Sequence, residues 1–390
     1  MKIVPTAPQP RIVPPSAPMV DELLVTARKR PERLDSLPAG VSVVSADQLA
    51  ITNAYDVRAT AGQLVGVLTT NLGPGRDKIL IRGLSDGAFT GRARSTVSTY
   101  LDDAPLNYNA PDPDLRLTDV AQVETVRGPQ GALYGTGAIS GVYRIVTNKP
   151  DPDRYAAGAQ ATWATTRGGA PSYSGEGFAN LPIAMGRAAL RLVAYYDDQG
   201  GYLDDVSLRL SNVDSTLREG ARATLRLELA PTWTVDLGLV AQRLTSRDTQ
   251  YTTISNSLKR ANQVRESSDN DFGLATISLK GELGFADLNA TTSYVQHDYS
   301  ALYDASAADI SLFSTTGASL GIYSEAARIR RFVQDIVLTS TDAGPISWLA
   351  GVYGSSSHER TPGSLDILVN PAPAEPALGD AGEGLGAQLI

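Results

Sequence analysis

Beyond Pro150 the chain alternates apolar and polar residues with a period of two, and this pattern constrains the fold more than any other feature. Successive side chains of a strand point to opposite faces, so such a segment predicts a strand with one apolar and one polar face. Between Gly220 and Ala230 one face would carry Ala221, Ala223, Leu225, Leu227 and Leu229, and the other Arg222, Thr224, Arg226 and Glu228. Residues 187–196 and 272–283 alternate in the same way. We therefore expect a long antiparallel sheet.

The connections between these segments alternate between short and long. We expect short turns at residues 182–186, 230–232, 284–285 and 342–345, and long polar loops at residues 200–217, 245–270 and 300–326. Short turns at one end and long loops at the other are typical of an outer-membrane β-barrel. Trp233 and Trp348 each follow a short turn, where an interfacial aromatic girdle would place them. The pattern predicts about nine strands ending near His358.

Composition argues against several classes of function. The 42 acidic residues outnumber the 34 Lys and Arg, and a net charge of −8 disfavours nucleic-acid binding, which needs a basic surface. The chain has no Cys, and its two histidines, His297 and His358, are interpreted as ordinary polar contacts. We therefore expect no metal site and no thiolate or His-based catalysis.

The first 150 residues divide into three parts. Residues 1–20 are rich in proline and contain no apolar signal segment, so we expect a flexible linker in a chain that lacks its signal peptide. The apolar run from Asp21 to Ala27 favours a short strand without a partner nearby in the sequence, and a basic cluster follows it. Residues 31–150 mix β-prone runs with a helix capping box at residues 45–48, which predicts a compact α+β domain.

Two motifs invite a chemical interpretation that their spacing does not support. The Gly-rich segment from Gly128 to Gly141 is followed by a β-prone stretch and not by a helix, so it does not fit a dinucleotide or phosphate cradle. We interpret its glycines as turn residues with positive φ, preceded by an Arg127 that bonds to backbone or carboxylate. The acidic groups fit no Ca²⁺ loop and are interpreted as solvated turns: Asp102-Asp103, Asp112-Pro113-Asp114, Asp197-Asp198 and Asp204-Asp205. We expect no cofactor.

Three segments resemble the TonB-dependent outer-membrane receptors, and the resemblance extends from Asp21 to Gly354. Glu22-Leu23-Leu24-Val25-Thr26, with the basic cluster after it, is similar to the TonB box of that family. Residues 79–84 and 100–105 are similar to two segments of its plug domain. The most specific match is the stretch 119–150, whose structural motif contains Arg127, Gly128, Pro129, Gly131, Tyr134, Gly135 and Gly141.

The resemblance implies a membrane β-barrel, incomplete in this chain, with an N-terminal α+β plug domain. Its parts would be a Pro-rich linker (1–20), the TonB box and basic follower (21–30), the plug (31–150), a partial barrel (151–358) and a loop or tail (359–390). A family barrel has roughly 22 strands, so the strands expected here cannot close one. The implied location is the outer membrane of a Gram-negative bacterium, in contact with its lipid.

The resemblance also implies transport with no enzymatic activity, and it implies a set of partners. Its default substrate is a ferric siderophore taken up with energy from the TonB energy-transducing protein, which would pair with residues 22–26 exposed in the periplasm. Arginines suit an anionic chelate, and Tyr and Asn suit stacking and hydrogen bonding. The candidate substrate contacts are Arg82, Arg92, Arg94, Asn107, Tyr108 and Asn109.

Other interpretations stay open at this point. The chain fits a receptor of the same family for an oligosaccharide or another nutrient, and it fits a passive porin or a non-functional fragment. A surface enzyme or adhesin on a soluble β-sandwich is a further alternative. The motifs also depart from the family pattern at Asp103, Thr136-Gly137 and Tyr143, which should affect plug packing more than coupling.

Overall fold

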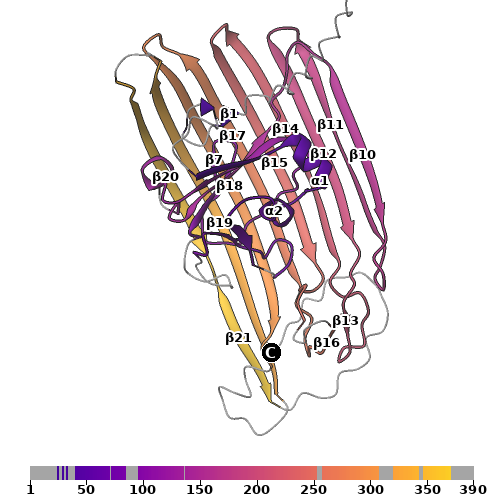
Figure 1. The fold of residues 1–390 in the computed structure, drawn as a ribbon. Coiled ribbons are helices and arrows are strands. Elements are labelled where there is room, and N and C mark those ends of the chain that lie inside the picture. Colours follow the sequence, from indigo (N-terminus) through magenta and orange to yellow (C-terminus); the bar gives the residue numbers. More distant parts are fainter. Residues whose placement is uncertain are drawn as a thin grey trace, which may run out of the picture.

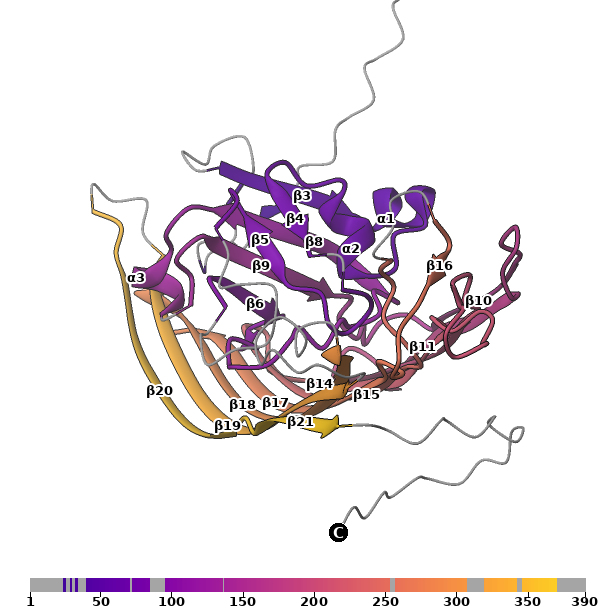
Figure 2. The same cartoon turned by 90° about the horizontal axis from the view of Figure 1, so that it is seen from below.

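The computed structural model describes residues 24–25, 29, 32–33, 40–70, 72–84, 95–135, 137–252, 257–306, 319–341 and 346–369 of the chain. An N-terminal domain lies in the concave face of one large curved sheet, which we call the wall (Figures 1 and 2). Within the described residues, no helix is both long enough and apolar enough to cross a membrane.

The wall is built of antiparallel strands that follow one another in chain order. They are β10 (Ala156–Ala164), β11 (Ser172–Ala184), β12 (Ala188–Gln199), β14 (Thr216–Ala230), β15 (Trp233–Ser246), β17 (Ser268–Glu282), β18 (Ala286–Asp304), β19 (Ser319–Ser340), β20 (Leu349–Arg360) and β21 (Gly363–Val369). The path from β10 to β20 contains nine strands, as the alternation predicts.

Residues 363–369 differ from the expected loop or tail. They form β21, which pairs with the first residues of β19, Ser319 to Glu325. β20 pairs only with the later part of β19, from Arg328 onward. The 22-residue β19 therefore has backbone groups beyond the reach of β20, and the chain after β20 continues along them because paired groups are favoured over unpaired ones.

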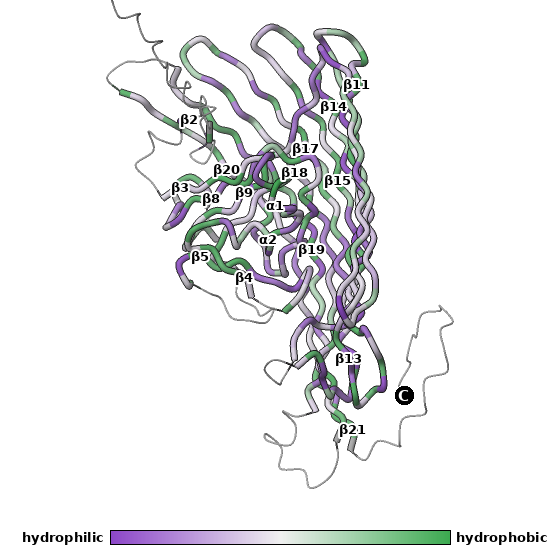
Figure 3. The backbone as a smooth tube through the Cα atoms, turned by 45° about the vertical axis from the view of Figure 1, so that its right-hand side comes forward, coloured by the Kyte–Doolittle hydropathy of each residue, from purple (hydrophilic) through white to green (hydrophobic). Residues whose placement is uncertain are grey.

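Hydrophilic and hydrophobic residues alternate along the strands of the wall (Figure 3), and this alternation places them on opposite faces of the sheet. Val193, Val295 and Ile329 point inward and are buried. Apolar residues on the other face, such as Leu239 and Val352, are exposed, and no second sheet covers them within the described residues. A soluble β-sandwich, which buries the apolar face between two sheets, is therefore not the fold of this chain.

The ends of the wall differ as predicted. Short turns join β11 to β12, β14 to β15 and β17 to β18. The fourth expected turn, at residues 342–345, lies outside the described residues. At the other end the long connections contain β13 (Asp204–Asp205) and β16 (Lys259–Arg260), which pair with each other in parallel. We call these the short-turn end and the long-loop end.

The N-terminal domain is the predicted α+β unit. Its main sheet has the order β3-β8-β9-β6-β7, formed by β3 (Gly40–Ser45), β8 (Val120–Arg127), β9 (Gly141–Thr147), β6 (Val97–Leu101) and β7 (Ala104–Pro105); beside it lie the pair β4 (Val67–Thr69) and β5 (Ile79–Ile81) and the helices α1 (Ala46–Thr52), α2 (Val57–Ala61) and α3 (Gly131–Tyr134). The capping box forms as predicted, because Ser45 Oγ accepts from Gln48 N (3.3 Å) and Gln48 Oε1 accepts from Ser45 N (3.0 Å).

One apolar core joins the domain to the wall. Tyr108, Tyr143 and Ile145 of the N-terminal domain share a buried cluster with Phe272 and Ile329 of the wall. Each large apolar side chain that is buried contributes roughly 1.5–3 kcal/mol to stability. The domain is therefore held in the wall by packing as well as by polar contacts.

The first described strand contradicts the sequence prediction. β1 (Leu24–Val25) pairs with β2 (Glu32–Arg33), so the expected absence of a nearby partner is wrong. Val25 is only 1% exposed and packs with Tyr100, Val126 and Tyr134. The apolar run folds back because this small hydrophobic patch on the domain removes Val25 from water.

Candidate functional site at the interface between domain and wall

Buried ion pairs connect the N-terminal domain to the wall near the long-loop end. Arg218 on β14 donates to Asp114 of the domain (Nη2 to Oδ2, 2.5 Å). Arg116 of the domain pairs with Asp197 on β12 (2.9 Å) and with Glu176 on β11 (2.8 Å). Arg116 also lies over the ring of Tyr55, 4.8 Å from its centroid. The guanidinium groups of Arg116 and Arg218 are almost fully buried. Removal of an acidic partner would therefore leave a buried charge without compensation.

A second set of contacts surrounds one aspartate. Arg191 on β12 binds both carboxylate oxygens of Asp119, with Nη2–Oδ1 and Nε–Oδ2 distances of 2.6 and 2.7 Å. Arg222 on β14 donates to the backbone oxygen of the same residue (2.8 Å). A bidentate arginine fixes both the position and the orientation of its partner. Asp119 therefore ties the chain between β7 and β8 to two neighbouring wall strands.

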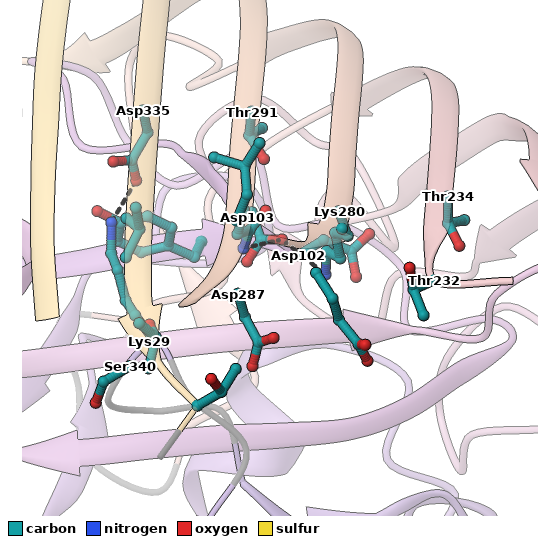
Figure 4. Close-up of a pocket in the computed structure, with 18 of the residues that line it drawn as sticks. Lys29, Asp102, Asp103, Thr232, Thr234, Lys280, Asp287, Thr291, Asp335 and Ser340 are labelled. Atoms are coloured by element: carbon teal, nitrogen blue, oxygen red, sulfur yellow. Dashed lines mark hydrogen bonds and ion pairs between the residues drawn. The ribbon is translucent and has the colours of Figure 1, made fainter. Parts of the chain in front are cut away.

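The short-turn end encloses a cavity of about 800 Å³ between domain and wall (Figure 4). Asp103 projects into it and pairs with Arg144 of the domain (2.7 Å) and Lys280 on β17 (3.2 Å). Lys29, in the basic cluster after β1, forms an ion pair with Asp335 on β19, and its ammonium lies 5.6 Å from the ring centroid of Tyr134. The segment that follows β1 is thus tied to the wall beside this cavity.

Charge pairing keeps the aspartates at this cavity ionised. Burial opposes ionisation of Asp103, but attraction to Lys280 and Arg144 outweighs it and holds the pKa of Asp103 well below its usual range. Burial likewise opposes ionisation of Asp102, yet Lys149 and the hydrogen bonds from Thr147 lower the pKa of that carboxyl. Asp103, a departure from the family pattern, therefore adds a charged link between domain and wall.

The acidic groups of the sequence are not simply solvated turns. Asp114, Asp197 and Asp205 are 7%, 6% and 1% exposed, so that prediction is wrong for these three residues. They are buried because arginines on the wall or in its loops reach them, as Arg260 reaches Asp205 (3.3 Å). Within the described part of the chain, no group of three or more acidic, His or Cys residues has an arrangement that would hold a metal ion.

The residues expected to contact substrate occupy different environments. Asn107 accepts hydrogen bonds from Arg331 on β19 at both its backbone and side-chain oxygens (2.5 and 2.9 Å). Tyr108 is buried edge-on against His297, at 5.4 Å between ring centroids, and the Asn109 N–H donates to Glu359 (3.4 Å). In this structure these three residues anchor the domain to β18–β20, so a role in substrate contact stays a prediction. Arg82 is exposed, whereas Arg92 and Arg94 lie outside the described residues.

The two histidines were expected to make ordinary polar contacts. His297 Nε2 lies 2.7 Å from the side-chain oxygen of Asn270, inside the interface. His358 is exposed on β20. The placement of His297 agrees with the prediction.

The Gly-rich motif shapes the domain. Arg127 donates to the backbone oxygens of Gly40 (3.2 Å) and Val65 (3.1 Å), as predicted. Gly128 and Gly135 have φ values of 99° and 71°, which glycine adopts without strain. Pro129 and Gly131 follow in the turn into α3, and Tyr134 at the end of α3 packs edge-on against Tyr100, at 5.1 Å between ring centroids. At Gly141 a Cβ atom would lie 2.3 Å from the backbone oxygen of Val126.

Sequence reasoning missed most of the wall residues that hold the domain. Arg191, Arg218 and Arg222 lie at inward positions of their strands. The sequence did contain a signal for these residues. The arginines lie on the polar face of strands whose other face is apolar. Their partners Asp114 and Asp119 lie 72 to 104 residues earlier, and alternation carries no information about such pairs.

Comparison with known proteins identifies the N-terminal domain. The family model of the TonB-dependent Receptor Plug Domain matches residues 33–142. These residues form a TonB-dependent receptor plug domain. It is 26% identical over 368 residues to the pesticin receptor of Yersinia pestis, covering 90% of this chain and 50% of that protein. A shorter match, 29% over 135 residues, covers 33% of this chain and 20% of the iron-regulated outer membrane virulence protein of Vibrio cholerae.

Solved structures agree on the fold. The ferric yersiniabactin uptake receptor FyuA from Yersinia pestis superposes with a TM-score of 0.70 at 21% identity, over 84% of this chain and 50% of that one. The siderophore receptor PiuA from Acinetobacter baumannii gives 0.66 at 18%, over 88% and 48%. The N-terminal domain therefore has the fold of a plug, and the wall has the fold of part of the barrel that surrounds it. The chain spans about half the length of these relatives.

The plug also provides a pH-dependent test of the interface. Burial raises the pKa of the Asp112 carboxyl to about 6, above its usual value of 3.8, and the charge of Asp114 adds to the shift. A carboxyl with a raised folded-state pKa favours the folded state at low pH, and that contribution is lost as pH rises through about 6. Asp112→Asn keeps an oxygen acceptor for the Asp114 N–H (2.8 Å) but cannot ionise.

We expect Asp112→Asn in the full-length receptor to be more stable than wild type above pH 6. Its unfolding midpoint should also change less between pH 4 and 6. Thermal unfolding measured across this range is the test. If the unfolding midpoints of wild type and variant changed in parallel with pH, Asp112 would not titrate in this window.

Proposed function

We propose that the chain is the plug and first barrel strands of an outer-membrane receptor that imports a ferric siderophore with energy from TonB. The observation that carries the proposal is the position of β1, the described part of the TonB box. It lies on the plug beside Lys29, whose ion pair with Asp335 is at the short-turn end of the wall. In a receptor barrel the short turns face the periplasm, where TonB is available.

The coupling segment is Glu22, Leu23, Leu24, Val25 and Thr26. Leu24 and Val25 are described, and Glu22, Leu23 and Thr26 lie outside the described residues. The expectation of an exposed segment does not hold for Val25, which is buried. We infer that the structure represents a docked state, and that residues 22–26 add as a strand to TonB after leaving the plug.

The nature of the related receptors supports an iron chelate as substrate. The solved neighbours include receptors for ferric yersiniabactin, ferripyoverdine and ferric catecholates. Arg82, Arg92 and Arg94 stay our proposed contacts for an anionic chelate, because a planar guanidinium binds paired oxygens well. For Asn107, Tyr108 and Asn109, contact with a substrate would require that this part of the plug separate from β18–β20.

The test is uptake by the full-length receptor in an outer membrane that lacks other iron receptors. We expect iron-55 supplied as catecholate and mixed-chelate siderophores to accumulate only when TonB is present. Accumulation without TonB would indicate a passive pore. Transport of labelled oligosaccharides in place of every ferric chelate would indicate the alternative nutrient receptor.

A further inference from the structure

Two inward-pointing arginines of the wall share one carboxylate of the plug. Arg191 on β12 binds both oxygens of Asp119 (2.6 and 2.7 Å). Arg222 on β14 approaches the same carboxylate (3.4 Å) and donates to the backbone oxygen of Asp119 (2.8 Å). In the sheet register Arg222 lies opposite Val193, two residues along β12 from Arg191. We call Arg191 and Arg222 the arginine pair. Within the described residues, no carboxylate of the wall forms an ion pair with either of them.

Other carboxylates of this region each lie beside a different cation. The pairs are Asp236 with Arg226 (2.8 Å), Asp197 with Arg218 (3.8 Å), Asp102 with Lys149 (2.8 Å) and Glu176 with Arg116 (2.8 Å). The first two pairs are made within the wall, so they do not depend on the plug. Glu176 lies four residues along β11 from Asn180, the register partner of Arg191, which is about 14 Å along the strand. Removal of Asp119 therefore leaves the arginine pair without a carboxylate in contact.

The wall itself holds Arg191 in position. The guanidinium of Arg191 lies over the ring of Phe178, 4.6 Å from its centroid, and its Nη1 lies 3.5 Å from Asn180 Oδ1. Asn180 is 1% exposed and donates to two backbone oxygens just before β10 (2.8 and 2.6 Å). These contacts involve no plug residue, so they orient the guanidinium in the absence of Asp119 as well. A planar guanidinium that is already oriented loses little freedom when it binds an anion.

The plug is attached differently to the two sides of the wall. Toward β17–β19 it shares the apolar core, whose wall members on these strands are Phe272, Leu274, Val295 and Ile329. Toward β11, β12 and β14 it makes the buried ion pairs of Asp114, Arg116 and Asp119, and no described residue of these strands belongs to that core. Hydration of both charges offsets the separation of an ion pair, whereas exposure of apolar side chains to water has no such offset. The plug therefore separates more readily from β11–β14 than from β17–β19.

A route from the arginine pair to the short-turn end is already outlined. A cavity of about 40 Å³ borders Arg222 and is lined by side chains of both plug and wall. Its lining shares Asp102, Asp103 and Lys280 with the cavity of about 800 Å³ at the short-turn end (Figure 4). An anionic group that leaves the arginine pair after the plug has moved therefore enters the larger cavity.

We propose that the arginine pair is an anion-binding station on the path of the substrate, and that Asp119 occupies it in the closed receptor. The inference rests on the proposed function, because it requires a substrate that passes between plug and wall. When the plug separates from β12 and β14, Asp119 leaves with it and paired oxygens of an anionic chelate take its place. Guanidinium groups bind such oxygens through parallel hydrogen bonds, as Arg191 binds Asp119 here. The returning Asp119 then displaces the substrate toward the short-turn end.

Chemical rescue tests the anion site without any transport. Asp119 has a φ of 55°, so Asp119→Gly removes the carboxylate while the backbone conformation suits the new residue. The variant leaves two guanidinium groups buried without a counter-charge, and we expect the unfolding midpoint of the plug in the full-length receptor to fall. Acetate has the shape of the lost side chain and should raise this midpoint by about 3 °C or more. Acetamide, which has the same shape without the charge, should leave it unchanged.

The matched control for the rescue lacks the arginine pair. In Asp119→Gly/Arg191→Gln/Arg222→Gln, acetate should have no effect on the unfolding midpoint. An equal response to acetate in both variants, or no response of Asp119→Gly, would overturn the anion site.

Uptake tests the role of the site in transport. Asp119→Asn/Arg191→Gln/Arg222→Gln removes all three charges and keeps groups that form hydrogen bonds, so the plug should stay folded. With iron-55 supplied as a trianionic tris-catecholate chelate, we expect TonB-dependent uptake by this full-length variant to be about tenfold slower than wild type. Equilibrium binding of the chelate should be unchanged. The control Arg226→Gln/Asp236→Asn removes a charge pair made within the wall, and its uptake should stay within about twofold of wild type.

The outcomes separate this proposal from the proposed function. Wild-type uptake by the triple variant, or an equal loss of uptake in the control, would overturn the role in transport. Loss of chelate binding in the triple variant would place Asp119 or the arginine pair in the outer site instead of on the path. If wild type imports no ferric chelate while the acetate response holds, the proposed function fails and the anion site stands.

Discussion

Gly141→Ala should destabilise the plug more than a Gly→Ala substitution at any other glycine of the Gly-rich motif. A Cβ atom at this position would lie 2.3 Å from the backbone oxygen of Val126 and 2.8 Å from Ile81 Cδ1. Gly141 begins β9, an inner strand of the plug sheet, and pairs with Arg127 on one side and Val97 on the other. Neither neighbour is free to move, so we expect a loss of about 3 kcal/mol or more.

Gly131→Ala is the matched control for that change. Gly131 begins α3 in the same motif, and a Cβ atom there would meet no atom within 4 Å. Alanine also favours helix over glycine by about 1 kcal/mol, so this variant should be as stable as wild type or slightly more stable. Limited proteolysis of the plug in the full-length receptor, compared at rising temperature, measures both variants. Equal resistance of Gly141→Ala and wild type would contradict the close approach seen here.

The two glycines show how far sequence reasoning extends. Positive φ in the Gly-rich segment could be predicted from local composition, and Gly128 and Gly135 confirm it. The constraint at Gly141 could not, because it arises from Val126 on β8 and Ile81 on β5, which come close to this glycine only in the assembled domain. Local patterns predict local conformation, whereas close approach depends on the assembled domain.

The same distinction applies to the wall and its contacts with the plug. Alternation with period two is a local property, so it predicted the nine strands and the short turns that are described. The pairing of Arg218 with Asp114 depends on how deeply the plug sits in the wall, and no sequence pattern encodes that depth. Burial of Val25 was missed for a related reason, since its partners Tyr100 and Tyr134 come from distant parts of the plug.

Val25→Pro should abolish TonB-dependent uptake while leaving substrate binding unchanged. Proline removes the backbone N–H at this position and fixes φ near −65°, so residues 22–26 would lose a donor needed to pair with a sheet edge of TonB. Val25→Ile keeps the donor and should retain uptake, although the buried site makes an added methylene cost about 1 kcal/mol of docking stability. Iron-55 uptake and equilibrium binding, measured on the same full-length variants, provide the comparison.

Val25→Ala separates loss of coupling from loss of docking. Alanine keeps the N–H but removes most of the side chain that packs against Tyr100 and Tyr134, so it should free the segment from the plug without impairing strand addition. If backbone pairing with TonB couples energy to uptake, the receptor with Val25→Ala takes up iron and the receptor with Val25→Pro does not. If docking of Val25 on the plug is what uptake requires, both variants fail alike. Uptake retained by Val25→Pro would remove residues 22–26 from the coupling role, and lost binding would show that the substitution had damaged the plug itself.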